Sequence, residues 1–383
     1  MGYNARPMLR YTTAGESHGA CLIAMIEGIP YGMPVDLEHV NAELARRQGG
    51  YGRGARMKME KDEAEATTGV RLGHAIGGPL ALVVANRVQN SEQLSPITRP
   101  RPGHADLAGA MKFGTLDARD IAERSSARET AARVAAGALA NAMLRHFGVQ
   151  VVGYVVEMGG VAGATRLADA EAIRAARAQS LFYTQDEPLD RQIKEKVDAA
   201  RTAGDTLGGV FEVTAFGLPP GLGSHAGWAA KLDGRLARAL MSVQTVKGVE
   251  VGIGFGAARL RGSEMQDEIV MKEGQPARTR NNAGGIEGGM TNGQPLVVRA
   301  ACKPISTLRT PLRTVDLVTK DETTAQYERS DVAVVPAASV IGEAVVSFEL
   351  ARAFLDKFGG DTWEETRGRF ESFRATMGRF TRP

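Results

Sequence analysis

The sequence predicts a single α+β domain that consists of two similar halves, with one long helix of each half packed against the other. Three observations lead to this prediction. An alanine-rich helix is expected from about Ser126, a second helix of small residues is expected around Asp331, and three short motifs recur in the same order in both parts of the chain. Small residues on nearly every face are typical of a helix that packs closely on several sides.

Composition restricts the class of protein. The chain has 383 residues, of which 43% are hydrophobic and 24% charged, as in globular proteins with a sizeable core. A net charge of +3 is too small for a general nucleic-acid binder, so the clustered arginines indicate small anionic ligands. Cys21 and Cys302 lie in apolar segments and are expected to be reduced thiols. Neither a signal pattern nor an apolar run of membrane-spanning length is evident, and we expect a cytoplasmic protein without membrane or nucleic-acid partners.

The first part of the chain predicts strands at residues 8–13 and 21–26, joined by the turn Gly-Glu-Ser-His-Gly at residues 15–19. The flanking glycines should present His18 on this turn. Asp36 is expected to cap a helix that ends at Gly49. Strands are expected again between residues 57 and 87, with a turn at residues 77–80.

The basic segment between the helix and these strands contains Arg46, Arg47, Arg53 and Arg56. The alternative to an anion site here is a solvated basic loop.

The segment Thr-Arg-Pro-Arg-Pro-Gly-His-Ala-Asp covers residues 98–106. Its two prolines stiffen the chain and its glycine lets it turn, so His104 should be held in a defined place. The remaining histidines lack such neighbours and are interpreted as structural; they are His39, His74, His146 and His225.

The stretch at residues 123–137 predicts the start of the alanine-rich helix. Ser126 is expected to be its N-cap, and Glu129 would complete a capping box. Arg124 and Arg128 stand beside this helix start, where unpaired N–H groups and two guanidinium groups would make an anion site. The alternative is a well-capped core helix with two surface arginines.

The rest of the chain alternates strands and helices. Strands are expected at residues 151–158, 208–216 and 296–301, and helical segments at 169–203 and 229–243, the second of which is followed by a glycine-containing apolar stretch at 246–255. The glycine-rich loop at 281–293 has neither Walker nor Rossmann spacing, but its backbone could lie against a ligand. Lys-Pro-Ile-Ser-Thr follows a strand at 303–307. A small-residue helix is expected to open at residues 328–331, to be interrupted at Pro336 and to run to about Phe358, and Thr362 should cap a last helix through a box with Glu365.

Three motif pairs indicate an internal duplication. Glu-Arg-Ser occurs at 123–125 and 328–330, Gly-x-Pro-x-Gly at 28–32 and 217–221, and an apolar strand that begins Pro-Leu at 79–85 and 295–301. We expect one domain over residues 1–383, with pseudo-twofold halves at about 9–160 and 205–360 and a peripheral C-terminal helix at 361–383. The duplication would bring the two Glu-Arg-Ser helix starts towards one cleft.

The candidate residues favour acid–base chemistry on an anionic substrate. The histidines and cysteines lack the spacing of metal ligands, so no metal site is expected. A hydrolase triad of Ser17, His18 and Asp331 is conceivable, but adjacent residues on one tight turn rarely face each other. The many arginines suit a small substrate with several phosphate or carboxylate groups, and two histidines could transfer protons at separate points of it.

The blocks at 15–19, 99–106, 123–137 and 329–331 resemble the signature blocks of the chorismate synthase family, over about residues 9–360. The resemblance implies a β-α-β sandwich with long central helices between two mostly antiparallel sheets, assembled as a homotetramer. It implies a lyase that removes phosphate from 5-enolpyruvylshikimate 3-phosphate by an anti 1,4-elimination, which gives chorismate in the last step of the shikimate pathway of aromatic amino-acid biosynthesis. The family requires reduced FMN although the reaction has no net redox change.

The resemblance also implies roles for individual residues. His18 would donate a proton near the leaving phosphate, His104 would protonate or hold the reduced flavin, and Asp331 would help the C6 proton away, with Ser17 and Ser126 in relay or positioning. The substrate clamp would comprise Arg47, Arg53, Arg56, Arg101, Arg128 and Arg329. The FMN site would comprise Arg124, Ser125, Ser126, Gln244, Thr245, Gly288, Lys303, Pro304, Ile305, Ser306, Thr307 and Arg329, and the family has NADP contacts at the positions of Arg47 and Arg53. The length resembles the monofunctional form, so a separate flavin reductase is expected to supply reduced FMN, with NADPH only as a source of reducing equivalents.

Two other functions remain open at this point. A flavin-dependent NAD(P)H oxidoreductase would use the same cofactor, although the nucleotide-binding fingerprint is missing. An RNA-binding protein would use the arginine clusters, but low net charge and few aromatic residues argue against it.

Overall fold

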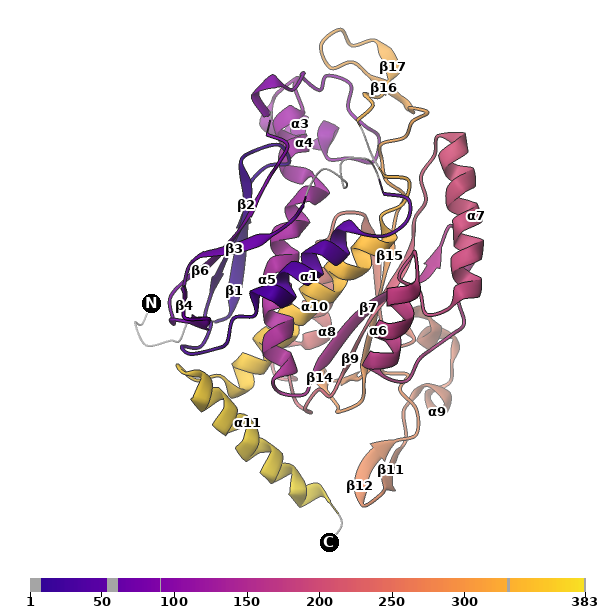
Figure 1. The fold of residues 1–383 in the computed structure, drawn as a ribbon. Helices are drawn as coiled ribbons and strands as arrows, with labels where there is room; N and C mark the ends of the chain where they lie inside the picture. Colours follow the sequence, from indigo (N-terminus) through magenta and orange to yellow (C-terminus); the bar gives the residue numbers. More distant parts are fainter. Residues whose placement is uncertain (1–7, 54–60, 90, 329–330, 382–383) are drawn as a thin grey trace.

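Two antiparallel sheets enclose a layer of helices, as Figure 1 shows for the computed structural model, which describes residues 8–53, 61–89, 91–328 and 331–381. The first sheet has the order β1-β2-β6-β3 and comprises β1 (Arg10–Ala14), β2 (Cys21–Glu27), β6 (Leu80–Ala85) and β3 (Ala64–Thr68). The second has the order β10-β15-β9-β7-β8 and comprises β10 (Val246–Val251), β15 (Leu296–Cys302), β9 (Gly209–Phe216), β7 (Gln150–Met158) and β8 (Val161–Ala162). The expected β-α-β sandwich is confirmed.

The central layer consists of α1 (Leu37–Gln48), α5 (Thr130–Arg145), α8 (Leu232–Met241) and α10 (Val335–Phe358). Helix α5 packs against β1, β2 and β6, α10 packs against β7, β9 and β15, and the two helices pack against each other. Their small residues make this possible. A Cβ atom added at Gly137 of α5 would lie 2.3 Å from the backbone oxygen of Ala344 in α10, so only glycine permits the observed approach.

Other elements cover the sandwich or extend from it. Helix α6 (Ala170–Gln179) packs on β7 and β9, on the face opposite to α10, and α7 (Glu187–Ala203) lies beside β8. The other α-helices in the described part of the chain are α3 (Asp106–Phe113), α4 (Arg119–Ser125), α9 (Gly262–Met265) and α11 (Trp363–Met377). The described residues also form small hairpins of β4 (Val70–Arg71) with β5 (His74–Ala75), β11 (Ile269–Lys272) with β12 (Gln275–Arg278), β13 (Ile286–Glu287) with β14 (Met290–Thr291), and β16 (Arg313–Val315) with β17 (Glu322–Thr324).

The two sheets have the same topology. If β1, β2, β6 and β3 are matched in turn with β7, β9, β15 and β10, these four strands have the same order in both sheets, and only β8 at the edge of the second sheet has no counterpart among the described strands. Each half also supplies one long central helix. This agreement supports the duplication inferred from the repeated motifs. The division of the chain differs from the expected one, because β7 pairs with β9 in the second sheet, whereas the first half was expected to extend to residue 160.

Two expected helix starts differ from the structure. Ser126 accepts a hydrogen bond from the backbone N–H of Arg128 but caps a short 3-10 turn, and α5 begins at Thr130. The capping box with Glu129 is wrong, because the Glu129 carboxylate binds Thr13 and Arg133 instead. Pro336 lies in the first turn of α10, where its missing N–H costs no helical hydrogen bond, so it opens the helix and does not interrupt it. The box of Thr362 and Glu365 is present, and it starts the outlying helix α11 (Figure 1).

Candidate functional site

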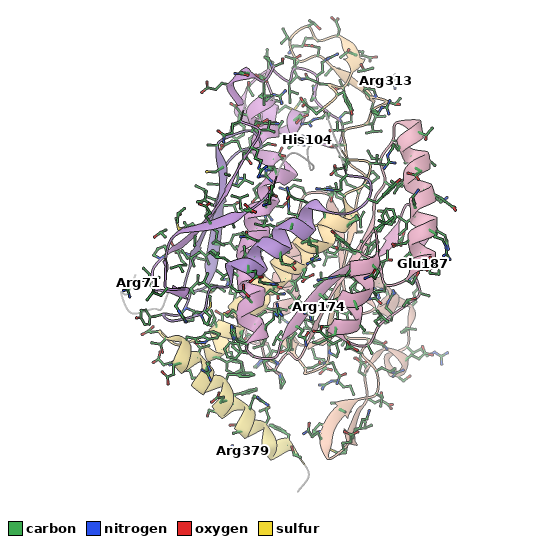
Figure 2. The ribbon with its side chains drawn as sticks, in the orientation of Figure 1. Arg71, His104, Arg174, Glu187, Arg313 and Arg379 are labelled. Carbon is green, nitrogen blue, oxygen red and sulfur yellow. The ribbon has the colours of Figure 1, made fainter. Side chains whose placement is uncertain are left out.

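The predicted site residues lie mainly on loops and helix starts at one end of the sandwich, near α3, α4 and the N-terminal ends of α5 and α10 (Figure 1). Figure 2 shows His104 at this end of the molecule, far from Arg379 at the end of α11.

The turn that carries Ser17 and His18 is held by α4. The backbone oxygen of Glu123 accepts a hydrogen bond from the Ser17 N–H at 3.2 Å, and its carboxylate accepts one from the His18 N–H at 2.8 Å. The ring atom Nδ1 of His18 lies 2.9 Å from Oε1 of Glu123. Ser126 Oγ donates to Ser17 Oγ at 3.2 Å, which joins the two serines predicted for proton relay.

The second histidine is held in a similar way. Nδ1 of His104 lies 2.5 Å from Oδ1 of Asp106, and Arg101 Nε donates to the other carboxylate oxygen at 2.7 Å. Burial raises the pKa of Asp106, but the hydrogen bonds and charges of His104 and Arg101 outweigh it and hold this pKa well below its usual range. Asp106 is therefore ionised and can only accept, so Nδ1 of His104 carries the hydrogen. Arg101 Nη1 reaches Thr307 Oγ1 at 3.4 Å.

Arg47 and Arg128 converge on one carboxylate. Asp62, whose side chain is fully buried, accepts from Arg47 at 3.2 Å through Oδ2 and from Arg128 at 2.5 Å through Oδ1. Arg47 also donates to Thr130 Oγ1 and to the backbone oxygen of Ala127, in the 3-10 turn before α5. Burial, together with the positive charges of Arg53 and Arg128, lowers the pKa of Arg47 to about 10, so the group stays charged at neutral pH. Arg47 is buried and is therefore not part of a solvated basic loop.

Asn86 ties this pair to the His18 turn. Its Oδ1 accepts from Arg128 Nε at 2.9 Å, and its Nδ2 donates to the backbone oxygens of Glu16 and Gly19 at 3.1 and 2.8 Å. The turn is thus held at both ends from β6, while Glu123 holds its centre.

Arg53 and Asp331 form an ion pair of 2.7 Å, and the charges of both act on the pKa of Arg47. Nε of Arg53 is buried and has no hydrogen-bond partner among the described residues. Arg46 does not join the site, because it pairs with the buried Glu343 of α10 at 2.7 Å. Arg56 and Arg329 lie outside the described residues.

A chain of contacts connects the residues predicted to bind the cofactor. Arg124 donates to the backbone and side chain of Thr13, Thr13 donates to Glu129, and Gln244 Nε2 donates to the same carboxylate at 3.4 Å. The next residue, Thr245, accepts from the backbone N–H of Lys303 at 2.9 Å, and Lys303 Nζ donates to the backbone oxygen of Gly103, beside His104. The segment 303–307 therefore bridges the Gln244 region and the His104 loop.

Gly288 is not part of this chain of contacts. It lies in the β13–β14 hairpin, whose Gly289 oxygen accepts from Leu232 at the start of α8, whereas Gln244 follows the end of α8. Helix α8 has 10 residues and is therefore about 15 Å long, so Gly288 and Gln244 lie near its opposite ends. Pro304, Ile305 and Ser306 lie in the bridging segment, where Ser306 approaches Gly103 and Ile305 accepts from Thr206 through its backbone oxygen.

Four polar residues in contact with the candidates were missed in the sequence: Asp62, Asn86, Asp106 and Glu123. Asp106 and Glu123 lie inside the quoted motifs, so proximity to a histidine or arginine motif could have indicated them. Asp62 and Asn86 adjoin strands β3 and β6 and give no local signal. Within the described part of the chain, no group of three or more His, Cys, Asp or Glu residues could hold a metal ion, and no helix could span a membrane.

Comparisons with known proteins agree on one family. The family model described as chorismate synthase matches residues 9–355. The chain is 53% identical to the chorismate synthase of Pelobacter propionicus, over 96% of this chain and 98% of that protein. It is 52% identical to that of Geobacter sulfurreducens, with the same coverage. A crystal structure of chorismate synthase superposes with a TM-score of 0.81 at 41% identity and covers 98% of this chain and 100% of that chain.

Proposed function

The chain belongs to the chorismate synthase family, lyases of the last shikimate step, and on this premise we propose that the residues described above bind its substrate and cofactor. The substrate, 5-enolpyruvylshikimate 3-phosphate, loses phosphate from C3 and a proton from C6. A site for this reaction must hold a phosphate and two carboxylates, donate a proton to the leaving group and accept another from carbon.

The arginines are arranged to bind such an anion. Arg47 and Arg128 are both buried and are held apart by the Asp62 carboxylate, so they enter binding with little side-chain freedom left to lose. Arg101 is fixed by Asp106, and Arg53 retains a buried Nε without a partner among the described residues. Guanidinium forks suit phosphate and carboxylate groups. Arg56 and Arg329 complete the proposed clamp from the family motifs.

The described residues fit a flavin mononucleotide. Ser125 Oγ and Gln244 Oε1 are buried and have no hydrogen-bond partner in the described part of the chain, and both lie along the band of contacts from Arg124 to Lys303. Unsatisfied buried polar atoms of this kind are costly unless a ligand pairs with them. Arg124, Ser126, Thr245, residues 303–307, Gly288 and Arg329 are the other proposed contacts. Reduced FMN, when bound, supplies an electron transiently and recovers it, which explains the absence of net redox change.

The protein's own groups would move the protons. His18, whose Nδ1–H would donate to Glu123, would carry a second proton on its other ring nitrogen, Nε2, and would donate it from the doubly protonated ring to the leaving phosphate. His104 would use the same nitrogen to hold or deliver a proton at the reduced flavin. Asp331, held by Arg53, would accept the C6 proton, and the Ser126–Ser17 hydrogen bond would support relay beside His18.

We further propose the setting in which the enzyme works. It would act as a homotetramer in the cytoplasm, with reduced FMN supplied by a separate flavin reductase and NADPH only as a source of reducing equivalents, through contacts that include Arg47 and Arg53. The support is the family membership of the chain.

One observation carries the proposal: two histidines held by carboxylates lie in the same connected site as the buried arginines. The test is an anaerobic assay with 5-enolpyruvylshikimate 3-phosphate and photoreduced FMN, in which chorismate and phosphate are followed. Chorismate and phosphate are expected in equal amounts when reduced FMN is present. Neither product is expected in the controls, which contain oxidised FMN or NADPH without reduced FMN. NADPH oxidation without chorismate would overturn the proposal in favour of an oxidoreductase.

A further inference from the structure

We propose that Glu123 is a positioning residue for His18, one that sets both the place of the ring and which ring nitrogen carries the hydrogen. This inference rests on the proposed function, because it assigns His18 a proton-transfer role. Glu123 directly precedes the residues 124–126 expected at the flavin, and it belongs neither to the expected catalytic set nor to the expected binding set.

The geometry concentrates three interactions of the turn on this one residue. Its backbone oxygen accepts from Ser17 N–H at 3.2 Å, and its carboxylate accepts from His18 N–H at 2.8 Å and contacts His18 Nδ1 at 2.9 Å. The side chains of His18 and Glu123 are 19% and 8% exposed, so solvent competes little for these bonds. The two backbone hydrogen bonds would be enough to hold the turn, whereas the contact with Nδ1 also fixes the ring.

The chemistry of the pair selects one tautomer. Burial raises the pKa of Glu123, but the hydrogen bonds and charge of His18 outweigh it and hold this pKa below its usual range. An ionised carboxylate only accepts hydrogen bonds, so Nδ1 must donate, and Nε2 is directed away from Glu123 on the opposite edge of the ring. In the neutral ring with its hydrogen on Nδ1, Nε2 can take up a proton, and the doubly protonated ring then donates that proton from Nε2. A histidine held in the other tautomer would have the wrong nitrogen available for this transfer even when it is correctly placed.

The surroundings favour this role over a general charge effect. The nearest approach of Arg119 to the Glu123 carboxylate is long, at 3.8 Å. Arg119 forms a shorter ion pair with Glu328, at 3.0 Å. The Glu123 carboxylate therefore has His18 as its close partner. Nδ1 of His104 contacts the Asp106 carboxylate in the same way, so both histidines are held by a carboxylate at the same ring nitrogen.

The test compares Glu123→Gln with Glu328→Gln, which removes a carboxylate from the same arginine but does not contact His18. Glu123→Gln is expected to lower kcat by about tenfold or more while KM and the dissociation constant for FMN change little. Glu328→Gln is expected to retain kcat. Because partners that act as a unit are non-additive, Glu123→Gln should cost little more in a His18→Ala background.

A spectroscopic readout does not depend on turnover. In NMR spectra of protein with ¹⁵N-labelled histidine, the His18 signals are those that disappear in His18→Ala. In the neutral ring these signals should show the hydrogen on Nδ1. In Glu123→Gln, His18 should no longer occupy this single tautomer. Unchanged kcat, an unchanged tautomer, or an equal loss of kcat in the His18→Ala background would overturn the assignment. If Glu123→Gln does not fold, Glu123→Asp, whose carboxylate is withdrawn by one methylene, is judged by the same criteria. Wild-type protein that makes no chorismate would reject the proposed function, whereas the tautomer measurement tests Glu123 separately.

Discussion

Arg53 and Asp331 form an ion pair across the site, with 2.7 Å between Nη1 and Oδ2. The pair joins the loop after α1 to the segment before α10, and the backbone N–H of Val332 also donates to the oxygen of Gly52. The Asp331 carboxylate is therefore oriented by an arginine.

Asp331→Asn is expected to lower kcat by about tenfold or more with a smaller change in KM, because the amide cannot accept the C6 proton but keeps the volume of the side chain. Steady-state chorismate formation with normal and C6-deuterated substrate measures the effect, and the isotope effect should increase. Asp198→Asn, which alters a surface ion pair on α7, is the control. An undiminished rate in Asp331→Asn would remove this residue from proton transfer.

His18→Ala and His104→Ala are each expected to reduce kcat by about tenfold or more while FMN and substrate still bind, since both rings are proposed to move protons and not to carry the binding charge. Anaerobic turnover and equilibrium binding measure the two properties. The exposed His225 supplies the control variant His225→Ala. Wild-type turnover in either test variant excludes that histidine from the mechanism.

Asp62→Asn should destabilise the protein by about 3–5 kcal/mol, because it leaves two buried guanidinium groups without their shared counter-charge. Both arginines should also lose their fixed positions, so KM should rise. Urea unfolding and steady-state kinetics measure the two effects. Glu63→Gln is the control, since this neighbour forms only an exposed pair with Lys61 and should change neither quantity. A stability equal to wild type would contradict the buried-pair interpretation.

Gly137→Ala should cost about 1–3 kcal/mol or more, because the new methyl group would be forced against the backbone of α10. Gly234→Ala is a matched control in another helix, where an added Cβ has no atom within 4 Å. It should be neutral or stabilising by about 0.4–1 kcal/mol. Chemical unfolding of both variants tests the expected difference in sign.

Stability should fall on acidification in a way that depends on Asp106. Its folded pKa lies below the ordinary 3.8, so the unfolded chain binds more protons in acid. The contribution of Asp106 is complete above this ordinary value and is lost as the pH falls towards the folded pKa. Asp106→Asn should therefore flatten the dependence of the urea midpoint on pH below about 5. Glu171→Gln, an exposed carboxylate on α6, should keep the wild-type slope.

The sequence correctly predicted helices and strands that are marked by cap residues or by short apolar runs. Helix α1 is capped by Asp36 and Gly49 as expected, and β2, β7, β9 and β15 agree with the expected strands within about two residues. The predicted box of Ser126 and Glu129 failed because a carboxylate that could cap its own helix finds stronger partners in Thr13 and Arg133. Pro336 was placed inside a helix because the true start at Val335 has no side-chain cap to mark it.

The candidate site residues could be proposed from the sequence, but the residues that hold them in place could not. His18, His104 and the arginines stand in motifs of unusual composition. Asp62 and Asn86 are ordinary polar residues near strand ends, and their importance arises from contacts with Arg128, which is more than 40 positions away in the sequence. Contacts between residues so far apart leave no recognisable pattern in a short stretch of the sequence.

The pairing of α5 with α10 also constrains how the chain can fold during synthesis. About 190 residues separate the end of α5 from the start of α10, and each helix buries its small-residue face against the other. At ribosomal rates of about 5–20 residues per second, α5 waits roughly 10–40 s before its partner has been made. During that interval its apolar face is exposed next to an incomplete sandwich. A chaperone that shields nascent apolar helices should therefore raise the yield of native enzyme more than it raises the yield of refolding from full-length chains.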